Sequence, residues 1–250
     1  MLAASCWGCG APAKSQTLSI AAAADLQFAL EELEHKFHSA HPALDVRVVY
    51  GSSGNFYSQL QSNAPFDLFL SADVEYPRRL AREGVAEPDS LFVYAVGRIV
   101  VWVPANSPLD VAGLEMRALE SDAVRHIAIA NPQHAPYGRA AEAAMRSAGV
   151  YDRVAPKLVL GENIAQTLEF VQSGAADIGL VALSLALAPP VRDRGKYWEV
   201  PLDAYPRVEQ GGAILKRARA PQAARDFRAF LLSDEGARVL RQYGFSLPGK

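Results

Sequence analysis

The stretch FVYAVGRIVVWVP, residues 92 to 104, decides how the chain is divided, because it is apolar except for Arg98 and too long for one ordinary strand. Gly97 lies near its middle. A glycine inside a strand pattern is typical of a sharp bend or of close approach by another part of the chain. The stretch therefore predicts a strand that leaves one sheet at Gly97 and continues into a second sheet.

On the N-terminal side of this stretch, short strand-like runs alternate with amphipathic helical runs. Strands are expected at LSIAAAA (18 to 24), DVRVVYG (45 to 51) and DLFLSAD (67 to 73). One helix is expected from Asp25, with Leu26, Leu30, Leu33 and Phe37 on one stripe. A second is expected over residues 54–61, and a third runs through Arg82 and is capped by Asp73. This alternation predicts a parallel sheet with helices on both faces.

On the C-terminal side the same alternation resumes. Strands are expected at HIAIANP (126 to 132), KLVLG (157 to 161) and DIGLVA (177 to 182), and helices at 139–149 and 164–173. VEQGGAILK (208 to 216) is interpreted as an extended crossing that returns to the first sheet, and two helices, 221–232 and 234–243, end the chain.

These elements predict an α/β protein of two lobes, each a mostly parallel sheet flanked by helices and joined by two extended hinge crossings. Lobe I is expected to comprise residues 14–97 and 208–250, and lobe II residues 98–207. The 250 residues, half of them hydrophobic, are enough to give each lobe a core. A formal net charge of −2 favours neither nucleic acid nor an anionic membrane as a partner.

Residues 1–13, MLAASCWGCGAPA, differ in character from the rest of the chain. Ala11-Pro12-Ala13 fits the small-x-small pattern read by signal peptidase, which predicts a signal-peptide remnant cleaved before Lys14. An uncleaved N-terminus is the alternative. Cys6 and Cys9 form a C-x-x-C that lacks both the strand-helix setting of a redox pair and the second ligand pair of a zinc site.

No motif for catalysis is present. The chain has no G-x-S-x-G, no G-x-x-x-x-G-K-[ST], no H-E-x-x-H and no G-x-G-x-x-G after a strand. His35, His38 and His41 recur every three residues near the end of the first helix. A solvated helix face explains this spacing without a metal, because the helix dipole favours positive charge there. We therefore expect a binding protein and not an enzyme.

Four strand-to-helix junctions contain the residues best suited to bind a ligand, because such junctions meet at the carboxyl ends of strands. They are Ala23-Ala24-Asp25, Gly51-Ser52-Ser53-Gly54, Pro136-Tyr137-Gly138 and Glu162-Asn163-Ile164-Ala165. A helix start has unpaired N–H groups and the positive end of the dipole, so it can hold an anion without lysine or arginine. Helix capping alone is the alternative for each junction, above all for Gly-Ser-Ser-Gly.

Across nearly its whole length the chain resembles the periplasmic molybdate-binding proteins of ABC transporters, in the type II periplasmic binding protein superfamily. The matching stretches are LSIAAAADL (18 to 26), YGSSGNFYSQL (50 to 60), APFDLFLSAD (64 to 73), YAVGRIVVWV (94 to 103), HIAIANPQHAPYG (126 to 138), SGAADIGLVAL (173 to 183) and FLLSDEGARVLRQYGF (230 to 245). The resemblance implies a type II clamshell whose lobes close on a small inorganic oxyanion.

By this resemblance, the amides of Ala24 and Asp25, the amide and hydroxyl of Ser53, Tyr137 and the amide of Ile164 hold molybdate or tungstate, with no metal-cation ligand and no cofactor. The implied partner is the membrane permease of an ABC transporter, and the implied location is the periplasm. The protein is expected to act as a monomer. Another oxyanion (phosphate, sulfate or vanadate) is the alternative cargo, and a ligand-sensing effector domain is an alternative role.

Two positions depart from the family pattern. Val181 stands where one branch has a tyrosine, whereas Tyr137 matches the tyrosine of the other branch. Asp25 stands where family members usually have a neutral serine or asparagine, and a carboxylate close to a dianion is repelled by it. Either the Asp25 side chain turns away and caps its own helix, which is the favoured hypothesis, or it accepts a proton from a partly protonated oxyanion.

Overall fold

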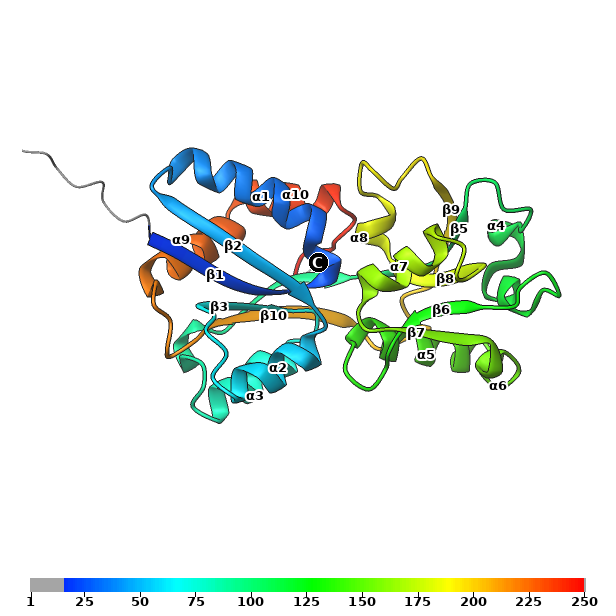
Figure 1. Cartoon of the computed structure of the whole chain (residues 1–250), viewed down its shortest axis with the longest axis horizontal. Coiled ribbons are helices and arrows are strands. Elements are labelled where there is room, and N and C mark those ends of the chain that lie inside the picture. The colour runs from blue at the N-terminus through cyan, green and yellow to red at the C-terminus, as the bar shows by residue number, and fades with distance from the viewer. Residues whose placement is uncertain (1–15, 250) are drawn as a thin grey trace, which may run out of the picture.

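The structure, a computed structural model, describes residues 16–249. Two five-stranded sheets, each with its own helices, form two lobes that lie end to end (Figure 1). The signal-peptide and C-x-x-C interpretations concern residues 1–13, which lie outside the described residues, and they stay predictions. Within the described part of the chain, no helix has the length and apolar character needed to span a membrane.

The first sheet has the strand order β2-β1-β3-β10-β4. Its strands are β1 (Gln16–Ala23), β2 (Leu44–Gly51), β3 (Leu68–Ser71), β4 (Phe92–Gly97) and β10 (Val208–Ile214). β1 pairs in parallel with β2 and β3, as expected for β-α-β units, whereas β10 runs antiparallel to both β3 and β4. The sheet is therefore mixed, and its antiparallel part is made by the two crossing strands.

Helices cover both faces of the first sheet (Figure 1). One group is α1 (Gln27–Ala40), α9 (Pro221–Leu231) and α10 (Asp234–Gln242), and the other is α2 (Ser53–Gln61) and α3 (Glu75–Arg82). α1 buries Leu30, Leu33 and Phe37, and the Phe37 ring meets that of Phe227 from α9 edge-on at 5.1 Å. The predicted apolar stripe of the first helix is thus its buried face.

The second sheet has the order β7-β6-β8-β5-β9. Its strands are β5 (Ile99–Pro104), β6 (Ile127–Ala130), β7 (Leu158–Gly161), β8 (Ile178–Ala182) and β9 (Gly195–Glu199). Its helices are α5 (Pro136–Ser147), α7 (Ile164–Gln172) and the short α4 (Val111–Leu114), α6 (Tyr151–Val154) and α8 (Leu183–Ala186). α5 and α7 lie on opposite sides of the sheet, because the chain steps from β6 outward to β7 and then back to β8 (Figure 1).

The chain changes sheets at Gly97, as predicted, with β4 ending there and β5 beginning at Ile99. A Cβ atom at Gly97 would overlap the hydroxyl of Tyr137, so only glycine lets the other lobe come this close. The chain returns between β9 and β10. The lobe boundaries at residues 97/98 and 207/208 stay a proposal, which this division of the strands supports.

Two local features differ from the expectations. α5 begins at Pro136, three residues before the expected start at 139, because proline is well suited to the first helical position and its missing N–H is not needed there. β9, with the sequence GKYWE, was not expected. It pairs only with β5 at the sheet edge and is half-buried, so it lacks the apolar pattern that marks the inner strands.

Candidate functional site

All five predicted ligand-binding residues line one cavity between the lobes. The lobes close tightly on it and leave a volume of only about 10 Å³. The lining residues are Ala23, Ala24, Asp25, Gly51, Ser52, Ser53 and Ala72 from the first sheet's side, and Ala135, Pro136, Tyr137, Asn163 and Ile164 from the second. Neither lysine nor arginine is among them, so the cavity offers an anion neutral donors only.

Four helical segments begin at this cavity. α2 begins at Ser53, α5 at Pro136 and α7 at Ile164, and a 3-10 turn over Ala24–Leu26 leads into α1. The N–H groups of a first helical turn have no acceptor within their own helix. The cavity therefore receives main-chain donors and the positive ends of helix dipoles from both lobes.

The two serines of the Gly-Ser-Ser-Gly turn have different roles. Ser52 caps α2, and its Oγ accepts from the N–H of Asn55 at 3.4 Å. Ser53 is fully buried, and its Oγ accepts from the N–H of Ala72 at 2.9 Å. Because that bond uses a lone pair of the oxygen, the Ser53 hydroxyl proton is left to donate to a ligand. Capping is thus done by Ser52, and Ser53 is available to the cavity.

The Asp25 side chain does not cap its helix, so the favoured hypothesis for its orientation is wrong. The turn it belongs to has no side-chain cap, and Asp25 is 1% exposed. Its Oδ2 instead accepts from the Tyr137 hydroxyl at 2.9 Å and from Nε2 of Gln210 at 2.5 Å. These donors come from α5 and β10, so the carboxyl is bound by elements outside its own helix.

Burial governs the protonation of this carboxyl. Desolvation raises the pKa of Asp25 to about 6, although the hydrogen bonds from Gln210 and Tyr137 lower it. Its other oxygen, Oδ1, is buried and has no hydrogen-bond partner among the described residues. The Tyr137 hydroxyl, expected to donate to a ligand, donates to Asp25 here, and desolvation raises its pKa, so the phenol stays protonated.

Gln210 was missed by the sequence reasoning, although a signal was present. It is a polar residue inside the apolar crossing VEQGGAILK, and it is fully buried. Its Oε1 accepts from the Tyr94 hydroxyl at 3.0 Å while its Nε2 reaches Asp25. A buried amide must have its hydrogen bonds satisfied, so its position in a strand already indicated polar partners nearby.

Several polar contacts join the lobes. The Gly54 N–H donates to the carbonyl of His134 at 2.9 Å, and Ser52 Oγ lies 2.9 Å from Nδ1 of His134. The Ser184 hydroxyl donates to the main-chain carbonyl of Asp25 at 2.7 Å. A Cβ at Gly54 would overlap the His134 carbonyl, so this approach requires glycine.

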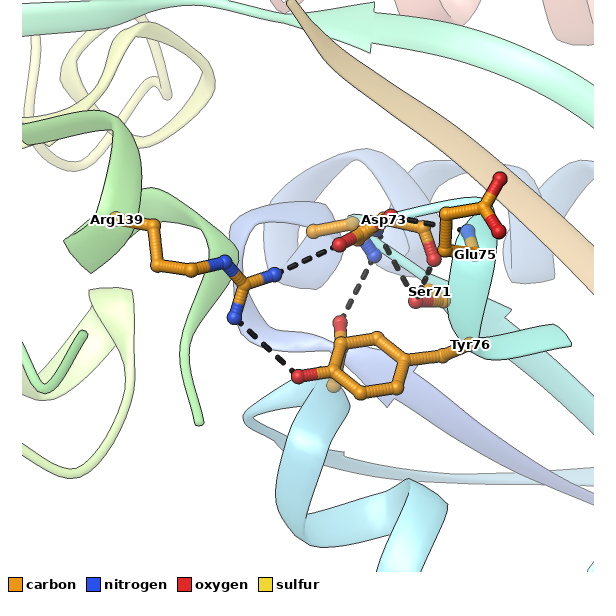
Figure 2. A network of polar contacts seen from close by, with 7 residues as sticks. Ser71, Asp73, Glu75, Tyr76 and Arg139 are labelled. Carbon is orange, nitrogen blue, oxygen red and sulfur yellow. Dashed lines mark hydrogen bonds and ion pairs between the residues drawn. The ribbon is translucent and has the colours of Figure 1, made fainter. Parts of the chain in front are cut away.

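A further contact between the lobes is the network in Figure 2. Arg139, on α5, pairs with Asp73 Oδ2 at 2.7 Å and donates to the Tyr76 hydroxyl at 3.3 Å. The other oxygen of Asp73 accepts from the N–H of Glu75 at the start of α3, so the predicted capping role and the ion pair share one carboxylate. The lobes are thus held closed over the cavity.

No cluster of three or more metal-ligating side chains occurs among residues 16–249. His35 and His38 instead line a larger, open hollow formed by α1 and the start of β2, together with Glu31 and Glu34. The carboxylates of that hollow would repel an anion, and it lies apart from the four helix starts. The cavity between the lobes is therefore the candidate site.

Comparison with known proteins agrees with this fold. Residues 18–246 match the protein family described as bacterial extracellular solute-binding protein. The molybdate-binding protein ModA of Rhodobacter capsulatus is 40% identical over 200 residues, which is 80% of this chain and 77% of that protein. The ModA of Azotobacter vinelandii is 34% identical over 237 residues, covering 94% of this chain and 92% of that one.

Solved structures give the same result. The periplasmic molybdate-binding protein of Azotobacter vinelandii superposes with a TM-score of 0.85 at 31% identity, covering 92% of this chain and 99% of that chain. The sulfate-binding protein SubI of Mycobacterium tuberculosis, 15% identical with a TM-score of 0.75 over 94% and 88% of the two chains, shares the fold. These likenesses confirm the predicted two-lobed fold and the resemblance to molybdate-binding proteins. The chain belongs to the family of bacterial extracellular solute-binding proteins and is accordingly a binding protein, not an enzyme.

Proposed function

We propose that this protein captures molybdate or tungstate in the cavity between its lobes and delivers it to the membrane permease of an ABC transporter. One observation carries the proposal: four helix starts, two from each lobe, meet at a cavity that no lysine or arginine lines. Relatives named as molybdate-binding proteins, at 40% and 34% identity, support the same cargo.

The donor set suits a tetrahedral dianion. The Ser53 hydroxyl and the first-turn amides of Ser53 and Ile164 are neutral groups whose directions are fixed by the helices that hold them. A hydrogen bond from such a donor to a charged acceptor contributes about 1.5–3 kcal/mol. Several fixed donors can therefore replace the hydration of the anion without a cationic side chain, and their spacing discriminates by size.

Capture by closure follows from where the donors lie. Because Ala24, Asp25 and Ser53 belong to one lobe and Tyr137 and Ile164 to the other, only the closed arrangement presents all of them to one anion. The bound anion thus stabilises the closed form relative to the open one. A permease can recognise the loaded protein by this shape, with the two crossings near Gly97 and residue 208 as the hinge.

We place the protein in the periplasm as a monomer. The family description, extracellular solute-binding protein, supports a location outside the cytoplasm, and the signal-like residues 1–13 support export. The cavity is completed by one chain, so capture needs no second copy.

Calorimetric titration with molybdate, tungstate, sulfate and phosphate tests the cargo. We expect one molybdate or tungstate per chain and far weaker binding of sulfate. The buried carboxyl of Asp25 favours one alternative, an oxyanion that brings its own proton, such as hydrogen phosphate. Tight binding of phosphate with no response to molybdate would contradict the proposal and support that alternative.

A further inference from the structure

The carboxyl of Asp25 is an unusual group for a cavity that receives an anion. Asp25 lines the cavity and is 1% exposed. Its Oδ2 is occupied by the donors of Tyr137 and Gln210, whereas Oδ1 has no hydrogen-bond partner among residues 16–249. A buried carboxyl oxygen without a partner carries a free-energy cost, so this atom is available for a further hydrogen bond.

The groups that face this carboxyl are neutral. Tyr137 from α5 and Tyr94 from β4 are its titratable neighbours, and both phenols have pKa values raised by burial. α1, α7 and α8 also pack against the turn that holds Asp25, and within the described chain no charge on them contributes to its pKa. Burial is therefore the largest influence on the pKa of Asp25, and it raises that pKa to about 6.

The guanidinium groups of Arg98 and Arg139 each pair with another carboxylate. Arg98, at the first crossing, pairs with Glu199 at 2.6 Å, and Arg139, on α5, pairs with Asp73 at 2.7 Å. Neither lines the cavity. An ionised Asp25 and a dianion would thus repel each other in a buried site with no cation between them, and one proton removes that repulsion.

We propose that Asp25 couples capture of a fully ionised oxyanion to the uptake of one proton, which binds Oδ1 and is donated in a hydrogen bond to an oxygen of the anion. The proton comes from solvent, the O–H bond at Oδ1 is the only bond formed, and nothing is oxidised or reduced. This inference rests on the proposed function, because it concerns how the same cavity accepts its anion.

The proposal predicts that molybdate affinity falls as the pH rises. Asp25 loses its proton as the pH rises through about 6, whereas with a dianion beside it the proton is retained to higher pH. Affinity for molybdate is therefore flat below about pH 6 and falls by about tenfold for each pH unit above it. Asp25→Asn keeps a donor and an acceptor in place of the protonated carboxyl, so its affinity is flat throughout and about 100-fold higher than that of the wild type at pH 8.

The experiment is calorimetric titration of molybdate at pH 8 in two buffers that differ in their enthalpy of ionisation, which counts the protons taken up. We expect close to one proton per molybdate in the wild type and close to none in Asp25→Asn. Asp122→Asn, which removes an exposed carboxylate that is not part of the cavity lining, is the matched control and should behave as the wild type.

The outcomes separate the two proposals. Molybdate binding by the wild type without proton uptake would overturn the inference and leave the proposed function standing. This measurement uses the wild type alone, so it does not depend on whether a variant folds. Equal affinity of wild type and Asp25→Asn across pH 5 to 8 would overturn it as well. Failure of both proteins to bind molybdate would overturn the proposed function, and the inference with it.

Discussion

Replacing Ser53 with alanine removes one hydroxyl from the cavity and leaves the main-chain donors of α2 in place. The structure predicts two effects of this change, one on stability and one on molybdate binding. The Ala72 N–H, now bonded to Ser53 Oγ at 2.9 Å, loses its buried acceptor, which lowers the free energy of unfolding by about 1–3 kcal/mol. The lost donor to the anion weakens molybdate binding by about 1.5–3 kcal/mol, or about 10- to 150-fold.

Ser90→Ala is a matched control for the effect on stability. Ser90 is also buried in lobe I, and its Oγ accepts from the N–H of Ile214 at the same 2.9 Å, but it does not line the cavity. Denaturant unfolding should show a similar loss of stability in both variants, and calorimetry should show weaker molybdate binding in Ser53→Ala alone. Unchanged affinity in Ser53→Ala, with stability lowered as in Ser90→Ala, would refute the assignment of Ser53 to the ligand.

Two further predictions concern the contacts between the lobes. Tyr137→Phe removes a hydrogen bond that lowers the pKa of Asp25, so that pKa should rise above about 6. In titrations from pH 5 to 9, molybdate affinity should therefore begin to fall at a higher pH than in the wild type. An unchanged onset would contradict the role given to this bond. Arg139→Ala breaks a partly exposed ion pair with Asp73 worth at most about 1 kcal/mol, so affinity should fall no more than about fivefold. Arg146→Ala, on the same helix but paired with Glu142 within it, should leave affinity unchanged, and equal effects of the two variants would argue against Arg139 as a contact that holds the closed form.

The helix starts at the cavity could be predicted from the sequence because their signals are local. Small residues, serines and Asn163 precede the starts of α1, α2 and α7, and the positions of Ser53 and Ile164 follow from these patterns. The start of α5 was placed three residues too late because Pro136 was not counted as a helical residue, although proline is common at the first position.

The orientation of Asp25 could not be predicted, because its partners are distant in the chain. Tyr137 and Gln210 lie 112 and 185 residues away, and nothing in the sequence around Asp25 indicates that both reach it. With only local information, a helix cap is the natural role for an aspartate at a helix start. Here two donors from other elements outweigh that preference, and only the packed structure shows it.

The antiparallel strand pairs were also beyond local patterns. β-α-β alternation fixes parallel pairing for β1, β2 and β3, and the same holds for β6, β7 and β8. The position of a crossing strand in the sheet depends on how all the strands of that sheet pack, and not on the residues around it in the sequence. β10 lies between β3 and β4, and Gln210 on it reaches Asp25.

A crystal structure of the protein with molybdate, with the metal located by its anomalous scattering, tests the central claim most directly. We expect a single molybdenum site per chain in the cavity between the lobes, with oxygens of the anion about 3 Å from the Ser53 hydroxyl and from the main-chain nitrogen of Ile164. An anomalous peak outside this cavity, or none at a concentration that saturates binding in solution, would contradict the account.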